Sequence, residues 1–132
     1  MARAQWPLLG DRPVIEIVLT FAQGGQKVTR TLLADTGAGN MQSKFEILLD
    51  ENDCLLCGGN PSQLVTLGGA YTGIYPLYVI RVEIPLLGFD DDVPAIGLPT
   101  PPLGLDGLAG FRLINRFTYG NFGNPLAFGL ET

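Results

Sequence analysis

The first part of the chain contains two largely apolar stretches separated by a turn. Residues 14–21 are rich in β-branched and large apolar side chains, which is typical of a strand. Residues 22–25 have the turn-like sequence Ala-Gln-Gly-Gly, and residues 27–34 alternate polar and apolar positions before becoming wholly apolar. This pattern predicts a hairpin whose second strand enters the core directly before Asp35.

The middle of the chain continues in short segments. Residues 43–53 fit either a strand or a short helix, and their pattern does not decide between the two. Residues 63–67 look extended, and the glycine-rich residues 68–73 predict a flexible tip. Residues 75–84 predict a strong strand, in which Pro76 is acceptable near the start or on a sheet edge.

The last third contains the segment most like a helix. Residues 90–92 are three aspartates and predict an acidic loop, before a short apolar run at 93–97 and a rigid proline-rich loop at 99–102. Residues 108–117 have apolar positions close to helical spacing, which predicts a helix. Residues 125–130 predict a final strand, and its apolar edge is a natural place for a partner chain to pair.

Eighteen glycines and ten prolines separate these apolar stretches, a composition typical of an all-β domain. The length of 132 residues suits one core, and there is neither an internal repeat nor a linker. We therefore expect residues 1–132 to form a single domain. Because the sequence has no apolar run of eighteen residues and no signal-like start, we expect a cytoplasmic protein without membrane contacts.

Charge and the absence of histidine exclude whole classes of function. The net charge is −5 and the eight basic residues are scattered, so nucleic acid is an unsuitable partner. Without histidine there is no Ser-His-Asp or Cys-His site and no ordinary zinc hydrolase site. We expect no cofactor and no metal, so any chemistry must use carboxylates, lysines, tyrosines or cysteines.

The two cysteines, Cys54 and Cys57, form a C-x-x-C pair. They are half of a structural zinc site, and the chain offers nothing to complete it. A redox pair would favour a helix start, whereas the following Gly-Gly-Asn-Pro predicts a turn. The simplest interpretation is a pair of loop thiols, and a metal bridge between two chains is a weaker alternative.

Asp35 stands out because it follows a wholly apolar stretch. A buried charge without partners is costly, so a loop must present this carboxylate. Thr36 supplies a hydroxyl and Gly37 supplies backbone freedom, as a tight turn around a carboxylate requires. An ordinary Asx turn at a strand end explains the local composition equally well.

The run from Leu32 to Ala38 (LLADTGA) resembles the active-site motif of the retroviral-type aspartic peptidases, the retropepsins. Three further segments follow in the order of that family. Residues 68–73 resemble its glycine-rich flap, residues 95–101 resemble its apolar-Gly-Pro-Thr-Pro stretch, and residues 108–114 resemble its helix entry. The resemblance implies a retropepsin-like acid protease β-barrel with one short C-terminal helix, a flap hairpin and a homodimeric assembly.

The sequence also departs from the retropepsin pattern. Gly39 stands where the family usually has Asp, and Phe111 stands where the viral members have Arg. Since those two residues commonly pair in the family, their joint loss leaves no unpaired charge. Arg112 replaces the usual Asp or Asn and puts the interface geometry in question.

By this resemblance Asp35 is the catalytic residue, and Thr36, Gly37 and Ala38 support its loop. Aspartic peptidase chemistry needs two adjacent carboxylates that share a proton, and the chain has no second Asp-Thr/Ser-Gly motif. A two-fold axis that brings together two copies of Asp35 solves this problem, so a homodimer acting on a polypeptide is expected. Because Ala38 cannot donate a hydrogen bond to the carboxylate, we expect activity at mildly acidic pH.

The predicted flap closes over an extended peptide. The residues that flex or touch substrate there are Gly68, Gly69, Ala70, Tyr71 and Gly73. Two other functions fit the same sequence: a non-catalytic dimeric peptide-binding module on this fold, and a structural β-domain in which the Asp-Thr-Gly-Ala run is accidental.

Overall fold

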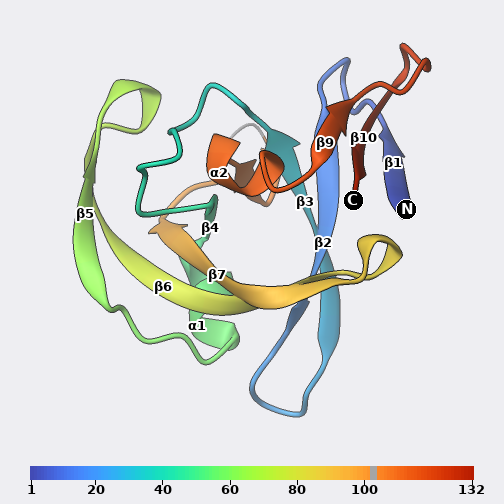
Figure 1. The fold of residues 1–132 in the computed structure, drawn as a ribbon. Helices are drawn as coiled ribbons and strands as arrows, with labels where there is room; N and C mark the ends of the chain where they lie inside the picture. The colour runs from blue at the N-terminus through green and yellow to red at the C-terminus, as the bar shows by residue number, and fades with distance from the viewer. Residues whose placement is uncertain (102–103) are drawn as a thin grey trace.

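The computed structural model describes residues 1–101 and 104–132, so part of the predicted proline-rich loop at 99–102 lies outside the described residues. The chain is built almost entirely of β-strands, which confirms the predicted all-β fold class (Figure 1). The strands are β1 Arg3–Pro7, β2 Val14–Thr20, β3 Lys27–Ala34, β4 Ile47–Asp50, β5 Gln63–Leu67, β6 Gly73–Ile84, β7 Phe89–Leu98, β8 Gly107–Ala109, β9 Thr118–Gly120 and β10 Ala127–Glu131. The helical elements are α1 Glu51–Leu56, α2 Phe111–Ile114 and the 3₁₀ turns Gly69–Tyr71 and Pro85–Leu87.

A closed barrel forms the body of the molecule. Its strand order is β2-β3-β8-β4-β7-β6, and the pairing of β6 with β2 closes the ring. The predicted hairpin of β2 and β3 is confirmed, with Val14 opposite Leu33 and Thr20 opposite Lys27. Strand β5 adds to the outside of this ring, on the edge of β6. Apolar side chains of these strands, including Ile15, Ile17 and Ile47, fill the barrel and are fully buried.

Strand β8 is a barrel strand that the sequence pattern missed. Residues 107–109 form a strand that pairs in parallel with β3 and antiparallel with β4, so Leu108 lies between Leu33 and Leu48. The predicted helix over 108–117 is therefore wrong in its first turn, and the helix α2 comprises only residues 111–114. Gly110 has an extended backbone and separates the two elements, as glycine disfavours a helix interior.

Gly107 explains why a strand fits between β3 and β4. A Cβ atom at this position would lie 2.1 Å from the backbone oxygen of Leu48 and 3.0 Å from the Leu32 side chain. Only a residue without a side chain allows such an approach. The helical spacing of the apolar residues arises because Leu108 and Leu113 are both buried, although they belong to different elements.

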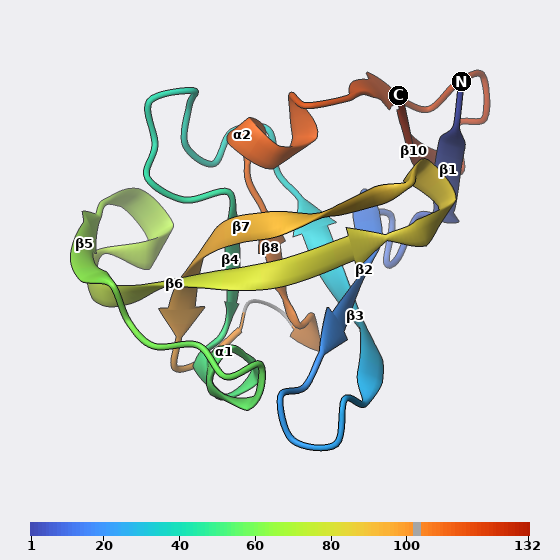
Figure 2. The same ribbon diagram turned by 60° about the horizontal axis from the view of Figure 1, so that its bottom comes forward.

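The chain ends form a separate three-stranded sheet of order β1-β10-β9. Figures 1 and 2 show this sheet on the opposite side of the molecule from the tip between β5 and β6. The final strand was expected to offer a free edge to a partner, but β10 is the central strand and both its edges are occupied. The prediction failed because strands β1 and β9 were not recognised, and these two short strands are the edges of the sheet.

Two further expectations are corrected. The aspartates at 90–92 are not a loop but part of β7, where they pair with residues 81–83 of β6 and point into solvent. The segment 43–53, left undecided between strand and helix, contains both β4 and the start of α1. The side chain of Asp50 caps α1 by accepting a hydrogen bond from the amide of Asn52. No helix in residues 1–101 and 104–132 is long and apolar enough to cross a membrane.

Candidate active site

Asp35 is the first residue after β3, and strand β8 fixes its backbone. The amide of Asp35 donates to the carbonyl of Ala109 at 2.9 Å, continuing the β3–β8 ladder by one residue. The amide of Ala38 then donates to the carbonyl of Asp35 at 3.1 Å, which closes a tight turn. The carboxylate is thus presented at the end of a barrel strand, as the sequence predicted.

The carboxylate of Asp35 is half-buried. Its Oδ1 accepts a hydrogen bond from the amide of Gly37 at 2.9 Å, the geometry of an Asx turn. A Cβ at position 37 would lie 3.2 Å from the same oxygen, so glycine leaves this contact unstrained. The second oxygen, Oδ2, accepts none of the hydrogen bonds found among the described residues, which leaves it free for a water or a substrate atom.

The other end of the loop is held by the start of α2. The amide of Phe111 donates to the carbonyl of Ala38, and the amide of Gly110 donates to the carbonyl of Glu46, both at 2.9 Å. A Cβ on Gly110 would lie 2.9 Å from the Ala38 oxygen, so this crossing also requires glycine. Residues 35–46, which we call the base loop, are therefore tied to β8 and α2 at both ends.

A cavity of about 320 Å³ joins the base loop to the hairpin tip between β5 and β6. Figures 1 and 2 show the tip curling toward the base loop. Of the nine site residues predicted from the sequence, six line the cavity: Asp35, Gly37, Ala38, Gly68, Ala70 and Tyr71. Thr36 is exposed in the turn, Gly69 lies in the tip outside the lining, and Gly73 pairs with Leu67 at the start of β6.

Sequence reasoning missed four residues that line the same cavity: Gly39, Phe45, Leu48 and Leu67. Phe45 and Leu48 belong to a buried cluster against which Ala38, Leu67 and Tyr71 pack. The sequence did not reveal Phe45 and Leu48, because residues 43–53 were left undecided between a strand and a helix. Their side chains could therefore not be assigned to one face of an element. The apolar floor indicates that the cavity suits apolar side chains.

Tyr71 is a residue of the hairpin tip whose phenol is influenced by the charge of Asp35 in the base loop. Its side chain is half-buried, and burial together with the negative charge of Asp35 raises the pKa of its phenol above the usual value. The two residues come from separate elements, and both line the same cavity.

A buried ion cluster is centred on Glu46, the last residue of the base loop. The carboxylate of Glu46 is almost fully buried and accepts two hydrogen bonds from Arg116, at 2.9 and 2.8 Å. Arg112 lies 3.5 Å from the same carboxylate and donates to the carbonyl of Ser43 at 3.0 Å. Arg112, which departs from the retropepsin pattern, thus stabilises the base loop within its own chain.

The cysteines lie away from the cavity. Cys54 is buried within α1 and Cys57 caps its end, so the interpretation as two loop thiols is wrong for Cys54. Burial raises the pKa of Cys54 to about 12 and that of Cys57 to about 11, so both thiols are protonated at neutral pH and poorly nucleophilic. Among the described residues, no cluster of three or more Cys, Asp or Glu is arranged to hold a metal ion.

Comparison with known proteins gives a similarity in overall fold to solved structures. No family model matches the chain, and no curated protein matches it. Among solved structures, the chain is similar to a retropepsin-like aspartic protease from Rickettsia conorii. The two chains are 18% identical with a TM-score of 0.48, and the match covers 90% of this chain and 92% of that protease.

Proposed function

We propose that this chain is one half of a homodimeric aspartic endopeptidase, with Asp35 as its catalytic carboxylate. The observation that carries the proposal is the shared cavity, in which an Asp-Thr-Gly-Ala turn at the end of a barrel strand faces a glycine-rich hairpin tip. The cavity is mostly apolar, and Asp35 is the charged group among the described residues that line it. An apolar cleft with a carboxylate at its wall suits the binding of a peptide beside a group that can activate water.

One Asp35 is not sufficient for this chemistry. In the proposed dimer the two carboxylates lie side by side and share one proton, because two like charges at that distance cannot both ionise. The ionised carboxylate takes a proton from a water molecule, and the protonated one gives its proton to the scissile carbonyl oxygen. The resulting tetrahedral intermediate collapses when the carboxyl group that took the water proton gives it to the leaving nitrogen and the C–N bond breaks. The other carboxylate takes back a proton from a hydroxyl of the intermediate, so the pair again shares one proton.

The partner copy would approach over the turn at Thr36 and Gly37, both of which are exposed in the single chain. In this arrangement the Thr36 hydroxyl bonds across the two-fold axis and locks the two turns together. The tip closes over the bound peptide and excludes water from the carboxylates. Tyr71, already coupled to Asp35, contacts the substrate from above.

Peptide cleavage by the purified chain tests this function, with the Asp35→Asn variant as control. The asparagine side chain can still accept the hydrogen bond from Gly37, so the turn and the fold should persist. We expect cleavage to fall by at least about a thousandfold, since general acid–base catalysis is lost. Cleavage that survives the substitution contradicts the proposal. Tight peptide binding by both forms without any cleavage favours the peptide-binding module instead.

The pH dependence of cleavage should reflect Ala38. Among the described residues the amide of Gly37 is the group that donates to the Asp35 carboxylate, and the alanine side chain adds no second donor. We expect a rate maximum at mildly acidic pH. A maximum near about pH 2–3 contradicts this expectation, because it requires further stabilisation of the ionised carboxylate.

A further inference from the structure

A second groove lies beside the cavity, along strand β5. It is lined on one side by residues 42–45 of the base loop and on the other by residues 64–67 of β5. Phe45 and Leu67 line both this groove and the Asp35 cavity, so the two spaces are adjacent. A peptide that occupies the cavity therefore has the groove next to it.

The shape of the groove suits an extended chain. Strand β5 ends the seven-strand order, so one of its edges is not paired with another strand in the described part of the chain. Backbone groups on such an edge can bond to a peptide that lies alongside. Along β5, Leu64 and Thr66 are exposed, and Leu64 offers an apolar contact to an incoming side chain.

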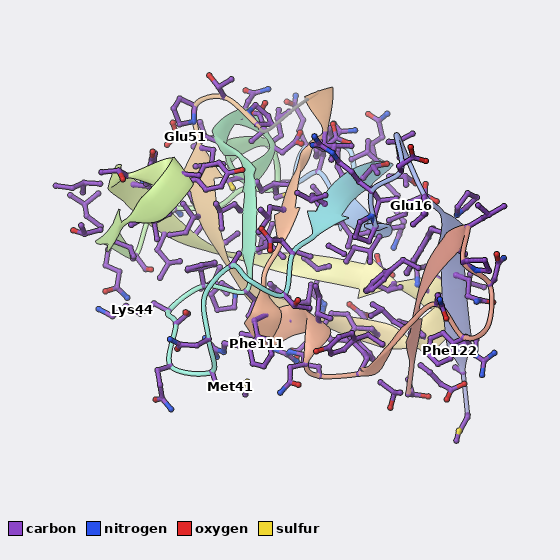
Figure 3. The ribbon with its side chains drawn as sticks, turned by 90° about the horizontal axis from the view of Figure 1, so that it is seen from above. Glu16, Met41, Lys44, Glu51, Phe111 and Phe122 are labelled. Carbon is purple, nitrogen blue, oxygen red and sulfur yellow. The ribbon has the colours of Figure 1, made fainter. Side chains whose placement is uncertain are left out.

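Lys44 gives this groove its charge. It is exposed, and it is the charged residue among the described residues that line the groove. Its Nζ lies 3.4 Å from Oε1 of Gln63 at the start of β5, so its side chain reaches across from the base loop to the hairpin. Figure 3 shows Lys44 projecting from the base loop on the side of β5, away from Phe111.

No carboxylate forms an ion pair with Lys44 among the described residues. The polar partner of its ammonium group within residues 1–101 and 104–132 is a neutral amide, and a long contact of 3.4 Å is a weak one. A carboxylate of a bound peptide is a stronger partner for an ammonium group than this amide. The protein as a whole is acidic, with a net charge of −5, so the positive charge of Lys44 distinguishes this groove from the overall charge of the protein.

We infer that Lys44 makes this protein select peptides with an acidic side chain at a fixed position beside the cleaved bond. This inference rests on the proposed function, because it assigns the groove to the same substrate. Lys44 acts as a specificity-determining residue and takes no part in bond cleavage.

A charge-swap experiment tests the inference. A family of peptides places Glu, Gln or Lys at each position on either side of a fixed apolar cleavage site, and kcat/KM is measured for each. For the unmodified chain we expect Glu to exceed Gln by about threefold at one position, as exposed charge pairs contribute modestly. Lys44→Glu should reverse the order at that position, and added salt should reduce both preferences.

Arg12→Glu is the matched control. Arg12 is exposed, forms no ion pair among the described residues and lines a different cavity with Leu9 and Leu105. It changes the net charge by the same amount as Lys44→Glu, so it should leave the preference unchanged. An equal change in both variants, or an unmodified chain without any charge preference, overturns the inference.

The outcome for Lys44 is separable from the proposed function. Cleavage of the neutral peptide tests the peptidase itself, whereas the ratio between the charged peptides tests Lys44. If no peptide is cleaved, the same ratios are measured as binding constants by fluorescence anisotropy. A preference for Glu that reverses in Lys44→Glu then supports the inference, and equal binding overturns it.

Discussion

The two walls of the cavity differ in how firmly the rest of the fold holds them. The base loop is tied to β8 by the amide of Asp35 and to α2 by the amide of Phe111, and its buried Glu46 carboxylate is bound by Arg116. The tip between β5 and β6 is held mainly by its own contacts, including the bond of the Thr72 hydroxyl to the carbonyl of Gly69 at 2.7 Å. Gly68, Gly69 and Ala70 are exposed.

This difference fits the two tasks that the proposed function assigns to the walls. A catalytic carboxylate must be held in one position, because small displacements reduce the rate strongly. A covering element must open and close, so it is drawn from the less firmly held parts of a fold. The two walls therefore predict opposite responses to similar substitutions.

The largest contrast concerns two glycines. Gly107→Ala places a Cβ 2.1 Å from the Leu48 carbonyl, between the strands that carry the base loop. We expect it to lower the free energy of unfolding by more than about 4 kcal/mol, since backbone cannot move aside easily. Gly68→Ala meets no atom within 4 Å and has an ordinary φ of −113°. It should change stability by less than about 0.5 kcal/mol.

Urea denaturation of both variants measures this contrast in stability. Peptide cleavage by Gly68→Ala then tests whether this glycine is needed for activity. If Gly68 is a hinge of the cover, that variant should lose activity without losing stability. Similar stability losses in the two variants would show that the tip is as firmly packed as the base, contrary to the comparison.

The buried carboxylate at the end of the base loop gives the next largest effect. Glu46→Gln removes the charge that faces Arg116 and Arg112, and the Glu46 side chain is only 2% exposed. We expect a loss of about 2–3 kcal/mol in the free energy of unfolding. The matched control is Glu131→Gln, which breaks the pair with Arg3, whose side chain is 45% exposed. It should cost less than about 1 kcal/mol.

Thermal unfolding of the two variants at one pH and salt concentration decides this prediction. Equal melting temperatures would mean that the ion cluster does not stabilise the base loop. Cleavage assays on Glu46→Gln should show a lower kcat, because the cluster holds the segment that carries Asp35.

The smallest effect concerns the contact between the two walls. Burial and the charge of Asp35 raise the pKa of Tyr71 above its ordinary value of 10.0. Because the folded state holds the phenol proton more tightly than the unfolded state, the contribution of Tyr71 to stability is complete at pH values below its ordinary pKa. This contribution is lost as the pH rises through the raised pKa of the folded state. In Asp35→Asn the pKa of Tyr71 should therefore fall toward 10.0, and the loss of stability at alkaline pH should diminish.

Ring ¹³C chemical shifts of labelled tyrosine, assigned with Tyr71→Phe, measure that pKa. No difference between the unmodified chain and Asp35→Asn would place the tip too far from the carboxylate in solution to cover it.

The sequence predicted the parts of the fold that depend on local patterns. Strand β3 and the turn at Asp35 follow from alternation and from the Asp-Thr-Gly composition, and the hairpin of β5 and β6 follows from its glycine-rich tip. Strand β8 was missed because three residues carry too little periodicity, and its position depends on Gly107 fitting between distant strands. Such close approaches are tertiary properties that a single sequence does not display.

The candidate site also contains some residues that the sequence indicated and others that only the structure shows. Asp35 and Tyr71 were found because a motif and a composition marked them, whereas Phe45 and Leu48 look like any other core residues in the sequence. Arg112 seemed to question the interface geometry, and its contacts to Ser43 and Glu46 were not predictable because both residues are distant along the chain. Nothing in the sequence marked Lys44 as a site residue, and only the structure shows that its side chain contacts Gln63 across the groove.

The central claim is that two copies of Asp35 make one site, and a mixing experiment tests it most directly. Unmodified chain and Asp35→Asn chain are equilibrated together at a constant total concentration, and cleavage is measured as the fraction of unmodified chain is varied. If the site needs both carboxylates, activity follows the square of that fraction, so an equal mixture keeps about one quarter of the activity. An equal mixture that keeps about one half, with a linear dependence throughout, would contradict the account, because each chain would then act alone.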